Sequence, residues 1–491
     1  MEFEVFKNSK IVDDFALRGA YMFGTDGIAT RRSQIVFKDG IIKCTKPNLE
    51  TAGLALLWPV DGFGSVLLPT TCLPERAQRY SLNVELARAK LMQIVTKQED
   101  WAFFDNVGDL EGSVREARDL FIRAIQNISD APLASRLADE SLEKATVFSE
   151  RLAIKQAESS LSERGRSRGF SRGCLGCQVN PVELTNAKYG EHLLDLFGFV
   201  TVPVKWSQIE SHRGNYDYSV VDACVSTLAR KRLAVCAGPL LCFSQEHLPD
   251  WLVRSGAGFE KIREMAYKFV LRTVARYSGS IHAWRVISGL NVFNHFGFSF
   301  EQILEMTRMA SMAVKQRSDR SLKIVEISNP WGEYYAVATN TIPPLVYIDM
   351  VVQSGISFDA FGLQIRMGKD EPGMHVRDMM QVSAVLDYFG GVGKPLYITE
   401  LEVPGENGSG SQVSQEAGLR HRKWDQLWQA QWLEQFYKIA LSKPFVEAVT
   451  YCHLTDAKDS VLPNSGLLTE QGEPKKSFLT LQELQGHIFG R

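Results

Sequence analysis

The sequence lacks long apolar runs and lacks an excess of either charge. No uninterrupted apolar stretch reaches 18 residues, so no membrane-spanning helix is expected. The 55 lysines and arginines balance 57 aspartates and glutamates, so the composition favours neither nucleic acid nor a membrane surface as a partner. The first residues, Met1 to Lys7, lack a basic segment followed by an apolar core. No secretory signal is visible, and a cytoplasmic location is expected.

The sequence also lacks the motifs that hold metals or phosphate cofactors. Eight cysteines are scattered, mostly inside apolar runs, which is typical of buried free thiols. Cys174 and Cys177 have the spacing of zinc ligands, but no second pair or histidine cluster follows. No glycine-rich phosphate fingerprint follows the strand-like run that begins at Cys174. Neither a metal nor an organic cofactor is predicted.

Composition divides the 491 residues into three regions. Residues 1–81 alternate short apolar runs with turns and predict a small antiparallel β domain. Residues 82–173 predict helices followed by an Arg/Gly/Ser linker. The four arginines of 163–173 suit phosphate, but a solvated hinge fits the balanced charge better. So small a β domain buries little core, so we expect the amino-terminal region to pack on the rest of the chain or to form a homo-oligomer.

The third region, residues 174–491, alternates strand and helix about eight times. This alternation predicts a parallel sheet that closes into a (β/α)8 TIM barrel, with an open doubly wound sheet as the alternative. The fold class is therefore α/β, a barrel preceded by a small β domain and a helical region. The predicted strands are 174–179, 198–204, 234–241, 283–287, 322–327, 360–365, 396–401 and 446–451, and the clearest helices are 220–233, 259–277, 300–314 and 429–441.

One predicted strand ends on a carboxylate. Leu396, Tyr397 and Ile398 form a β-prone run that leads to Glu400, and residues 405–411 behind it can only be a loop. Barrel enzymes keep their reacting groups at the carboxyl ends of the strands. At the matching end of the strand 283–287, where a partner acid is needed, the chain has Ser288 and Gly289.

Several segments, in order, resemble glycoside hydrolase family 10, the endo-β-1,4-xylanases. The resemblance covers about residues 174–487 and strengthens the barrel prediction. The segments that carry it are Lys205-Trp206 with Glu210, Gly214, Tyr216, Tyr218 and Asp222, then Leu248-Pro249-Asp250-Trp251-Leu252, Trp284-Arg285-Val286-Ile287, Phe361-Gly362-Leu363-Gln364, Ile398-Thr399-Glu400-Leu401, and Thr455-Asp456 with Gly466-Leu467-Leu468.

The resemblance implies hydrolysis of a β-1,4-linked, xylan-like glycan by two carboxylates. A retaining glycosidase attacks the sugar with one carboxylate and protonates the leaving oxygen with another about 5–5.5 Å away. Glu400 matches the nucleophile, whereas the acid/base position falls at Gly289, which has no proton to give. A structural ion pair between Glu400 and an arginine or lysine stays open as an alternative for this glutamate.

The sugar-binding positions implied by the resemblance are partly kept. Lys205, Trp206 and Gln364 are retained as substrate-binding candidates, and Arg366 stands where the family has a histidine. Arg366 beside Glu400 would keep that carboxylate ionised, which suits a nucleophile and a structural pair equally. Other family positions are replaced in this chain, at Thr201, Val202, Pro239, Phe243, Ser244, Cys452 and Val461.

Two functions therefore remain open. The chain is either a divergent glycan hydrolase with a relocated acid, or a catalytically inactive barrel that serves as a glycan-binding or assembly module. If only the acid is lost, activated aryl glycosides should form an adduct on Glu400, and a glutamate at position 289 should restore turnover. Candidates for a relocated acid are Asn291, His295, Glu333, Asp370, Glu371 and His375, while Glu402 lies one pleat further out than Glu400.

Overall fold

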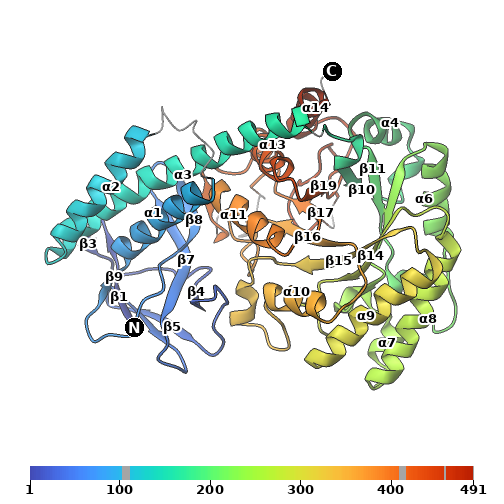
Figure 1. Cartoon of the computed structure of the whole chain (residues 1–491), viewed down its shortest axis with the longest axis horizontal. Helices are drawn as coiled ribbons and strands as arrows, with labels where there is room; N and C mark the ends of the chain where they lie inside the picture. The colour runs from blue at the N-terminus through green and yellow to red at the C-terminus, as the bar shows by residue number, and fades with distance from the viewer. Residues whose placement is uncertain (102–110, 168, 408–415, 458–459, 490–491) are drawn as a thin grey trace.

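The computed structural model describes residues 1–491 except 102–110, 168, 408–415, 458–459 and 490–491. Its carboxyl-terminal part is a closed parallel barrel, which confirms the predicted fold (Figure 1). Pairing between the third and fourth strands, Cys236 with Ala283 and Ala237 with Trp284, closes the sheet. The eight strands are β10 (Leu175–Gln178), β11 (Phe199–Val202), β12 (Ala234–Ala237), β14 (Ala283–Ser288), β15 (Leu322–Ser328), β16 (Ala360–Arg366), β17 (Leu396–Glu402) and β19 (Val446–Tyr451).

The helices of the barrel begin where the sequence provides caps. Ser299 with Gln302, and Asp378 with Gln381, form capping boxes in which each side chain accepts a hydrogen bond from the backbone N–H of the other residue. The helices are α4 (Ala187–Leu196), α5 (Trp206–Ile209), α6 (Ser219–Arg230), α7 (Asp250–Val253), α8 (Phe259–Tyr277), α9 (Phe300–Arg317), α10 (Pro344–Gln353), α11 (Met379–Gly390), α13 (Gln426–Ser442) and α14 (Lys476–Phe489).

The third strand is shorter than the predicted run 234–241. It ends at Ala237, and the short strand β13 (Leu241–Cys242) follows beyond Gly238 and Pro239. Proline has no N–H to donate to a neighbouring strand, so the ladder is interrupted there. The backbone N–H of Leu240 then donates to the carbonyl of Arg285 at 2.8 Å, and β13 pairs with the end of β14.

The amino-terminal region forms small sheets and three helices. Strands β5, β6, β1 and β9 make one sheet, and β8, β7 and β4 make another. These elements are β1 (Glu2–Glu4), β2 (Phe6–Lys7), β3 (Lys10–Ile11), β4 (Tyr21–Gly24), β5 (Gln34–Lys38), β6 (Ile41–Thr45), β7 (Ala52–Val60), β8 (Gly64–Pro69), β9 (Tyr80–Ser81), α1 (Leu82–Asp100), α2 (Glu111–Gln126) and α3 (Ala131–Ser167).

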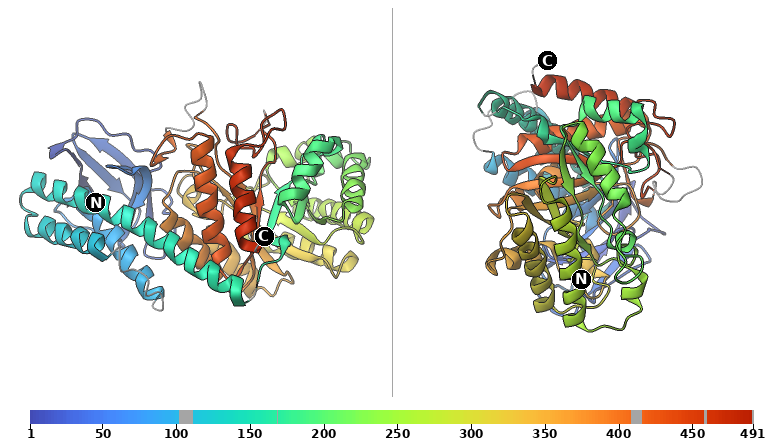
Figure 2. Two further views of the ribbon diagram at one scale, coloured as in Figure 1. Left: turned by 90° about the horizontal axis from the view of Figure 1, so that it is seen from above. Right: turned by 90° about the vertical axis from the view of Figure 1, so that its right-hand side faces the viewer.

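The amino-terminal region packs on the barrel, as expected. Figure 2 shows its strands at one end of the molecule and the barrel at the other. The strand β18 (Leu419–Arg420), from the loop after β17, completes the sheet β8-β7-β4. Gly64 permits this approach, because a Cβ there would lie 2.3 Å from the Leu419 carbonyl oxygen. The N–H of Leu67 donates to Val376 in the loop after β16, so the contact is with loops at the carboxyl ends of the strands.

The predicted linker 163–173 is only partly a linker. Helix α3 continues to Ser167 and lies along α13 (Figure 1). Near its end, Arg164 donates to the carbonyls of Leu441, Lys443 and Val446 at 2.7 to 3.1 Å. The prediction of a solvated hinge is therefore wrong at Arg164, because backbone carbonyls at the end of α13 and the start of β19 take up its guanidinium.

Glu150 of α3 fixes the loop that contributes β18. Its carboxylate contacts Arg420 Nε and His421 Nε2, each at 2.5 Å, and is buried. Burial by itself would raise the pKa of Glu150, but Arg420 and His421 outweigh it and lower the pKa from 4.5 to about 2. The carboxylate is thus ionised in the folded protein.

This pair predicts a loss of stability in acid. The pKa of Glu150 is lower in the folded than in the unfolded chain, so its stabilisation is present above pH 4.5 and disappears as the pH falls toward 2. We expect the stability difference between wild type and Glu150→Gln to shrink by about 3 kcal/mol between pH 5 and pH 2. Urea denaturation at both pH values measures it. A difference that stays constant with pH would contradict the prediction.

Candidate functional site

Glu400 lies at the carboxyl end of β17 and is held by two arginines. Arg285 Nη2 contacts its Oε1 at 2.6 Å, and Arg366 Nη2 contacts its Oε2 at 2.5 Å. Glu400 is buried, which by itself would raise its pKa, but the two guanidiniums prevail and lower the pKa to about 2. The carboxylate is ionised, and each oxygen accepts a charge-assisted hydrogen bond, which withdraws the electron density that a nucleophile needs.

Arg285 extends this pair into a chain of charges across the barrel. It is buried in β14, and its Nε and Nη2 contact the two carboxylate oxygens of Glu326 in β15 at 2.8 and 2.9 Å. Sequence reasoning missed both residues. A signal was present, since each is a charged side chain inside an apolar strand and therefore needs a partner.

Glu402 terminates the same chain of charges. Arg366 Nε lies 3.4 Å from its Oε2, while Ser465 Oγ donates to its Oε1 at 2.8 Å. Burial raises the pKa of Glu402, although Arg366 acts in the opposite direction. Two neighbouring carboxyl groups thus have pKa values displaced in opposite directions, Glu400 downward and Glu402 upward.

The space beside Gly289, the predicted acid/base position, is filled by neighbouring atoms. Gly289 has φ +59°, the left-handed region that glycine tolerates best, and begins a turn in which Phe293 N–H donates to its carbonyl at 2.7 Å. A Cβ at this position would lie 2.5 Å from Ser328 Oγ and 2.6 Å from Phe293 Cδ2. No room remains for a glutamate side chain, so we now expect Gly289→Glu to lose stability and not to gain turnover.

Gly289→Ala is expected to destabilise the protein by about 1–3 kcal/mol, because it combines a left-handed backbone with crowding. Gly256→Ala is the matched control, since Gly256 has φ +62° and no atom within 4 Å of its Cβ position. Chemical denaturation of both variants separates the two causes. Equal losses at 289 and 256 would show that Ser328 and Phe293 do not fill the position.

Lys205 lies at the same end of the barrel as Glu400. It directly precedes α5, is half-buried, and forms no ion pair with any residue that the structure describes. His247, in the loop after β13, is close enough to both to be affected by their charges. Burial lowers the pKa of His247; Lys205 also lowers it, and Glu400 raises it. Sequence reasoning missed His247, which no motif marked.

Trp206 does not present its ring to a sugar. The side chain is 3% exposed, and its indole stacks on Phe269 of α8 with ring centroids 5.0 Å apart. Its Nε1 donates to Glu210 at 2.8 Å. The structure therefore does not place this substrate-binding candidate where a sugar could stack on it, because the helix that begins at Trp206 turns its ring into the layer between strands and helices.

Gln364 is close to Glu400 in register but has other partners. It pairs with Glu400 across β16 and β17, and its amide nitrogen donates to Ser288 Oγ at 3.2 Å while its oxygen accepts from Ser328. The structure thus brings Gln364, Arg366 and Glu400 together. Gln364 is nevertheless buried and bonded at both amide atoms, which reduces its capacity to bind a ligand.

The candidates for a relocated acid have partners of their own. Glu333 accepts from Arg377, His375 and the N–H of Gly373, and His375 also contacts Asp370 at 2.9 Å. Within the described part of the chain, none of these groups forms a hydrogen bond or ion pair with Glu400.

The remaining candidates are no better placed. Asn291 is buried and donates to Tyr334 Oη at 2.7 Å and to the Ser328 carbonyl. Glu371 pairs with Lys369 at 2.6 Å. His295 is exposed, and its ring meets Phe296 edge-on.

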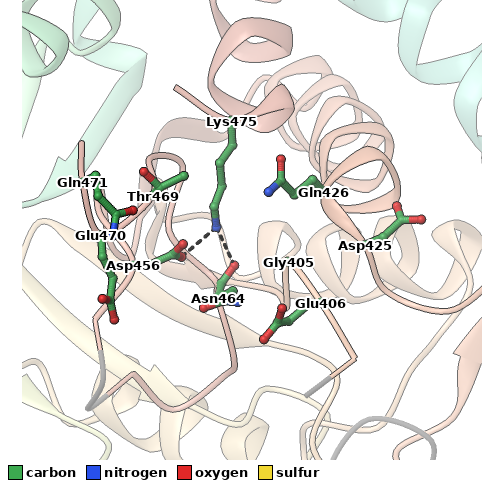
Figure 3. A pocket seen from close by; sticks show the side chains of 10 residues that line it. All are labelled: Gly405, Glu406, Asp425, Gln426, Asp456, Asn464, Thr469, Glu470, Gln471 and Lys475. Atoms are coloured by element: carbon green, nitrogen blue, oxygen red, sulfur yellow. Dashed lines mark hydrogen bonds and ion pairs between the residues drawn. The ribbon is translucent and has the colours of Figure 1, made fainter. Parts of the chain in front are cut away.

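A polar cavity of about 450 Å³ lies between the loops after β17 and β19 and the start of α13 (Figure 3). Lys475 points into its centre, and Nζ donates to Asp456 at 2.7 Å and to the carbonyls of Asn464 and Gly466. The ammonium group is therefore satisfied, and the exposed carboxylates and amides remain for a ligand. The lining residues are Gly405, Glu406, Asp425, Gln426, Asp456, Asn464, Thr469, Glu470, Gln471 and Lys475.

Comparison with known proteins agrees with this fold. The model of glycosyl hydrolase family 10 matches residues 168–301. An endo-1,4-beta-xylanase 5-like protein of Arabidopsis thaliana is 22% identical over 237 residues, which are 47% of this chain and only 40% of that relative. Xylanase 10B from Thermotoga maritima is similar with a TM-score of 0.51 and 19% identity, over 69% of this chain and 99% of that one.

A second solved structure gives the same result. Xylanase 10B from Thermotoga petrophila, in complex with xylobiose, has a TM-score of 0.51 and 19% identity, over 67% of this chain and 97% of that one. The fold is therefore a (β/α)8 barrel, as in these two solved structures. The chain is similar to glycosyl hydrolase family 10 over residues 168–301, and an additional amino-terminal region precedes the barrel.

Proposed function

We propose that this chain is a glycan-binding module with a family-10-like barrel that no longer performs retaining hydrolysis. The observation that carries the proposal is the paired loss at the site. The acid/base position is Gly289, whose side-chain space is occupied, and both oxygens of the nucleophile-position Glu400 are bound by Arg285 and Arg366. The chain therefore lacks an acid at position 289 to protonate the leaving oxygen. It also lacks a free carboxylate at position 400 to attack the sugar.

The proposed ligand is a β-1,4-linked glycan of the xylan type. The similar proteins are named xylanases, and one of the similar structures contains xylobiose. Polar groups at the carboxyl ends of the strands support binding: Lys205 and Arg366 at the same end of the barrel as Glu400, and the carboxylates and amides of the cavity around Lys475. The volume of this cavity, about 450 Å³, is in the range of binding sites for small ligands.

Calorimetric titration with xylohexaose, cellohexaose and maltohexaose tests this proposal. We expect the β-linked oligomers to bind and the α-linked maltohexaose not to bind. We also expect no shorter oligosaccharides in the calorimeter cell after the titration. A loss of binding in Lys205→Ala would place the ligand at the end of the barrel that holds Glu400. A loss in Glu406→Ala would place it in the cavity around Lys475. If no oligomer binds, the glycan-binding proposal fails and an assembly role becomes the better explanation of the barrel.

A second candidate function is hydrolysis with Glu402 as the relocated acid. It is favoured by the opposite pKa displacements of Glu400 and Glu402, since acid and base groups of glycosidases show such a difference. Burial opposes it, because Glu402 is 1% exposed and its Oε1 accepts from Ser465 and from the N–H of Leu462. Hydrolysis abolished by Glu402→Gln would support this candidate.

A further inference from the structure

A groove of about 420 Å³ lies between α1 and α2, remote in sequence from the barrel. Its lining is mostly apolar and comes from one stripe on each helix. The opposite stripe of α2, with Val114, Ala117, Leu120 and Ala124, is buried, and α2 packs on α3. The lining residues of the groove are Arg88, Leu91, Met92, Val95, Thr96, Arg118, Phe121 and Ile122.

Three of the apolar side chains that line this groove are exposed to solvent, while Leu91 is buried and Phe121 is partly buried. Met92 is 55% exposed, Val95 39% and Ile122 52%. Residues 88, 92 and 95 on α1, and 118, 122 and 125 on α2, follow the spacing of one helix face. Helix α2 thus carries two exposed isoleucines, Ile122 and Ile125, on a face that its packing on α3 does not use. Exposed apolar side chains that gather in one groove mark an interaction site more strongly than ones scattered singly.

The groove has a positively charged rim. Arg88 and Arg118 stand on opposite walls, and Arg88 lies over the ring of Phe121 with its guanidinium 5.2 Å from the centroid. Arg88 is paired with Glu85, whereas Arg118 and Arg115, one turn earlier on the same face, form no ion pair with any residue that the structure describes. Arg118 donates to Gln98 Oε1 at 3.4 Å, and because this amide is neutral it leaves the positive charge of Arg118 uncompensated.

We propose that this groove binds an amphipathic helix of a partner protein that carries acidic residues beside its apolar stripe. The groove between two neighbouring helices accepts the side-chain ridge of a third helix, and the three helices then form one layer. The rim selects carboxylates and disfavours lysine-rich helices. It also disfavours a second copy of this chain, because a two-fold contact through the groove would bring Arg118 toward its own symmetry mate.

Fluorescence anisotropy with the full chain tests the proposal. The probe is a fluorescein-labelled 18-residue helical peptide with leucines at positions i, i+3, i+4 and i+7 and glutamates flanking the stripe, compared with the same peptide carrying lysines. We expect the glutamate peptide to bind at least about tenfold more tightly, which corresponds to about 1.4 kcal/mol. Arg118→Glu should reverse this preference.

Ile122→Glu should weaken binding of the glutamate peptide at least about tenfold, because it places a negative charge among the apolar side chains that line the groove. The matched control is Val220→Glu on α6, where the valine is 56% exposed and outside the groove; it should leave binding unchanged. Equal binding of the two peptides, or an equal loss in the control, would overturn the proposal. So would a dimer in sedimentation equilibrium that Ile122→Glu dissociates, since the occupant would then be a second copy.

Discussion

Arg285→Met is expected to lower the free energy of unfolding by about 3–5 kcal/mol. The substitution removes the cation from between Glu326 and Glu400 and leaves two buried carboxylates, of which Glu326 has no other ion-pair partner in the described residues. Removing one member of a buried pair costs more than the pair itself contributes, because the remaining charge is desolvated without compensation. Urea denaturation followed by circular dichroism measures the loss.

Arg276→Met is the control for this prediction. Arg276 also pairs with a carboxylate, Asp222 at 2.5 Å, but its side chain is 48% exposed. An exposed pair contributes about 0–1 kcal/mol, so this variant should differ little from wild type. Replacing Arg285, Glu326 and Glu400 together by apolar residues of similar volume should recover most of the stability. Similar losses for Arg285→Met and Arg276→Met would show that burial does not decide the effect.

Xylan hydrolysis by this chain is expected to be at least about 10²–10⁴-fold slower than by a xylanase that keeps both carboxylates. This range is the contribution of general acid catalysis, and Gly289 cannot supply it. We expect a second loss of hydrolytic activity, because both oxygens of Glu400 are bound by guanidinium groups. Reducing-sugar release measured beside Thermotoga maritima xylanase 10B gives the ratio.

An activated 2-fluoro-xylobioside distinguishes the loss of the general acid from the loss of a free carboxylate at Glu400. A good leaving group needs no acid, so a free Glu400 would form a covalent adduct that mass spectrometry detects. We expect no adduct for the wild type, and Glu400→Gln as control should look the same. An adduct on Glu400 would show that Arg285 and Arg366 do not prevent nucleophilic attack by this carboxylate. Rapid xylan hydrolysis that is lost in Glu400→Gln would contradict the proposed function.

The sequence by itself predicted the elements that repeat or that carry local signals. Eight strand-like runs and the helices between them were visible because buried parallel strands are short apolar runs bounded by turns. The strand-end position of Glu400 followed from the same pattern, and the replacement of the acid at Gly289 followed from the family resemblance. The small core that its length allows indicated that the amino-terminal region packs on the barrel or on a second copy of the chain, and the structure shows the contact with the barrel.

Only the tertiary structure decided which groups meet. Arg285 and Glu400 are 115 positions apart, and Arg164 reaches carbonyls 277 to 282 positions away, so no local pattern reveals either contact. The same holds for Trp206, whose ring faces Phe269 and not a ligand, and for Ser328, which occupies the space beside Gly289. Burial and charge pairing depend on what the other strands bring to the same point in space, and a single chain segment does not contain that information.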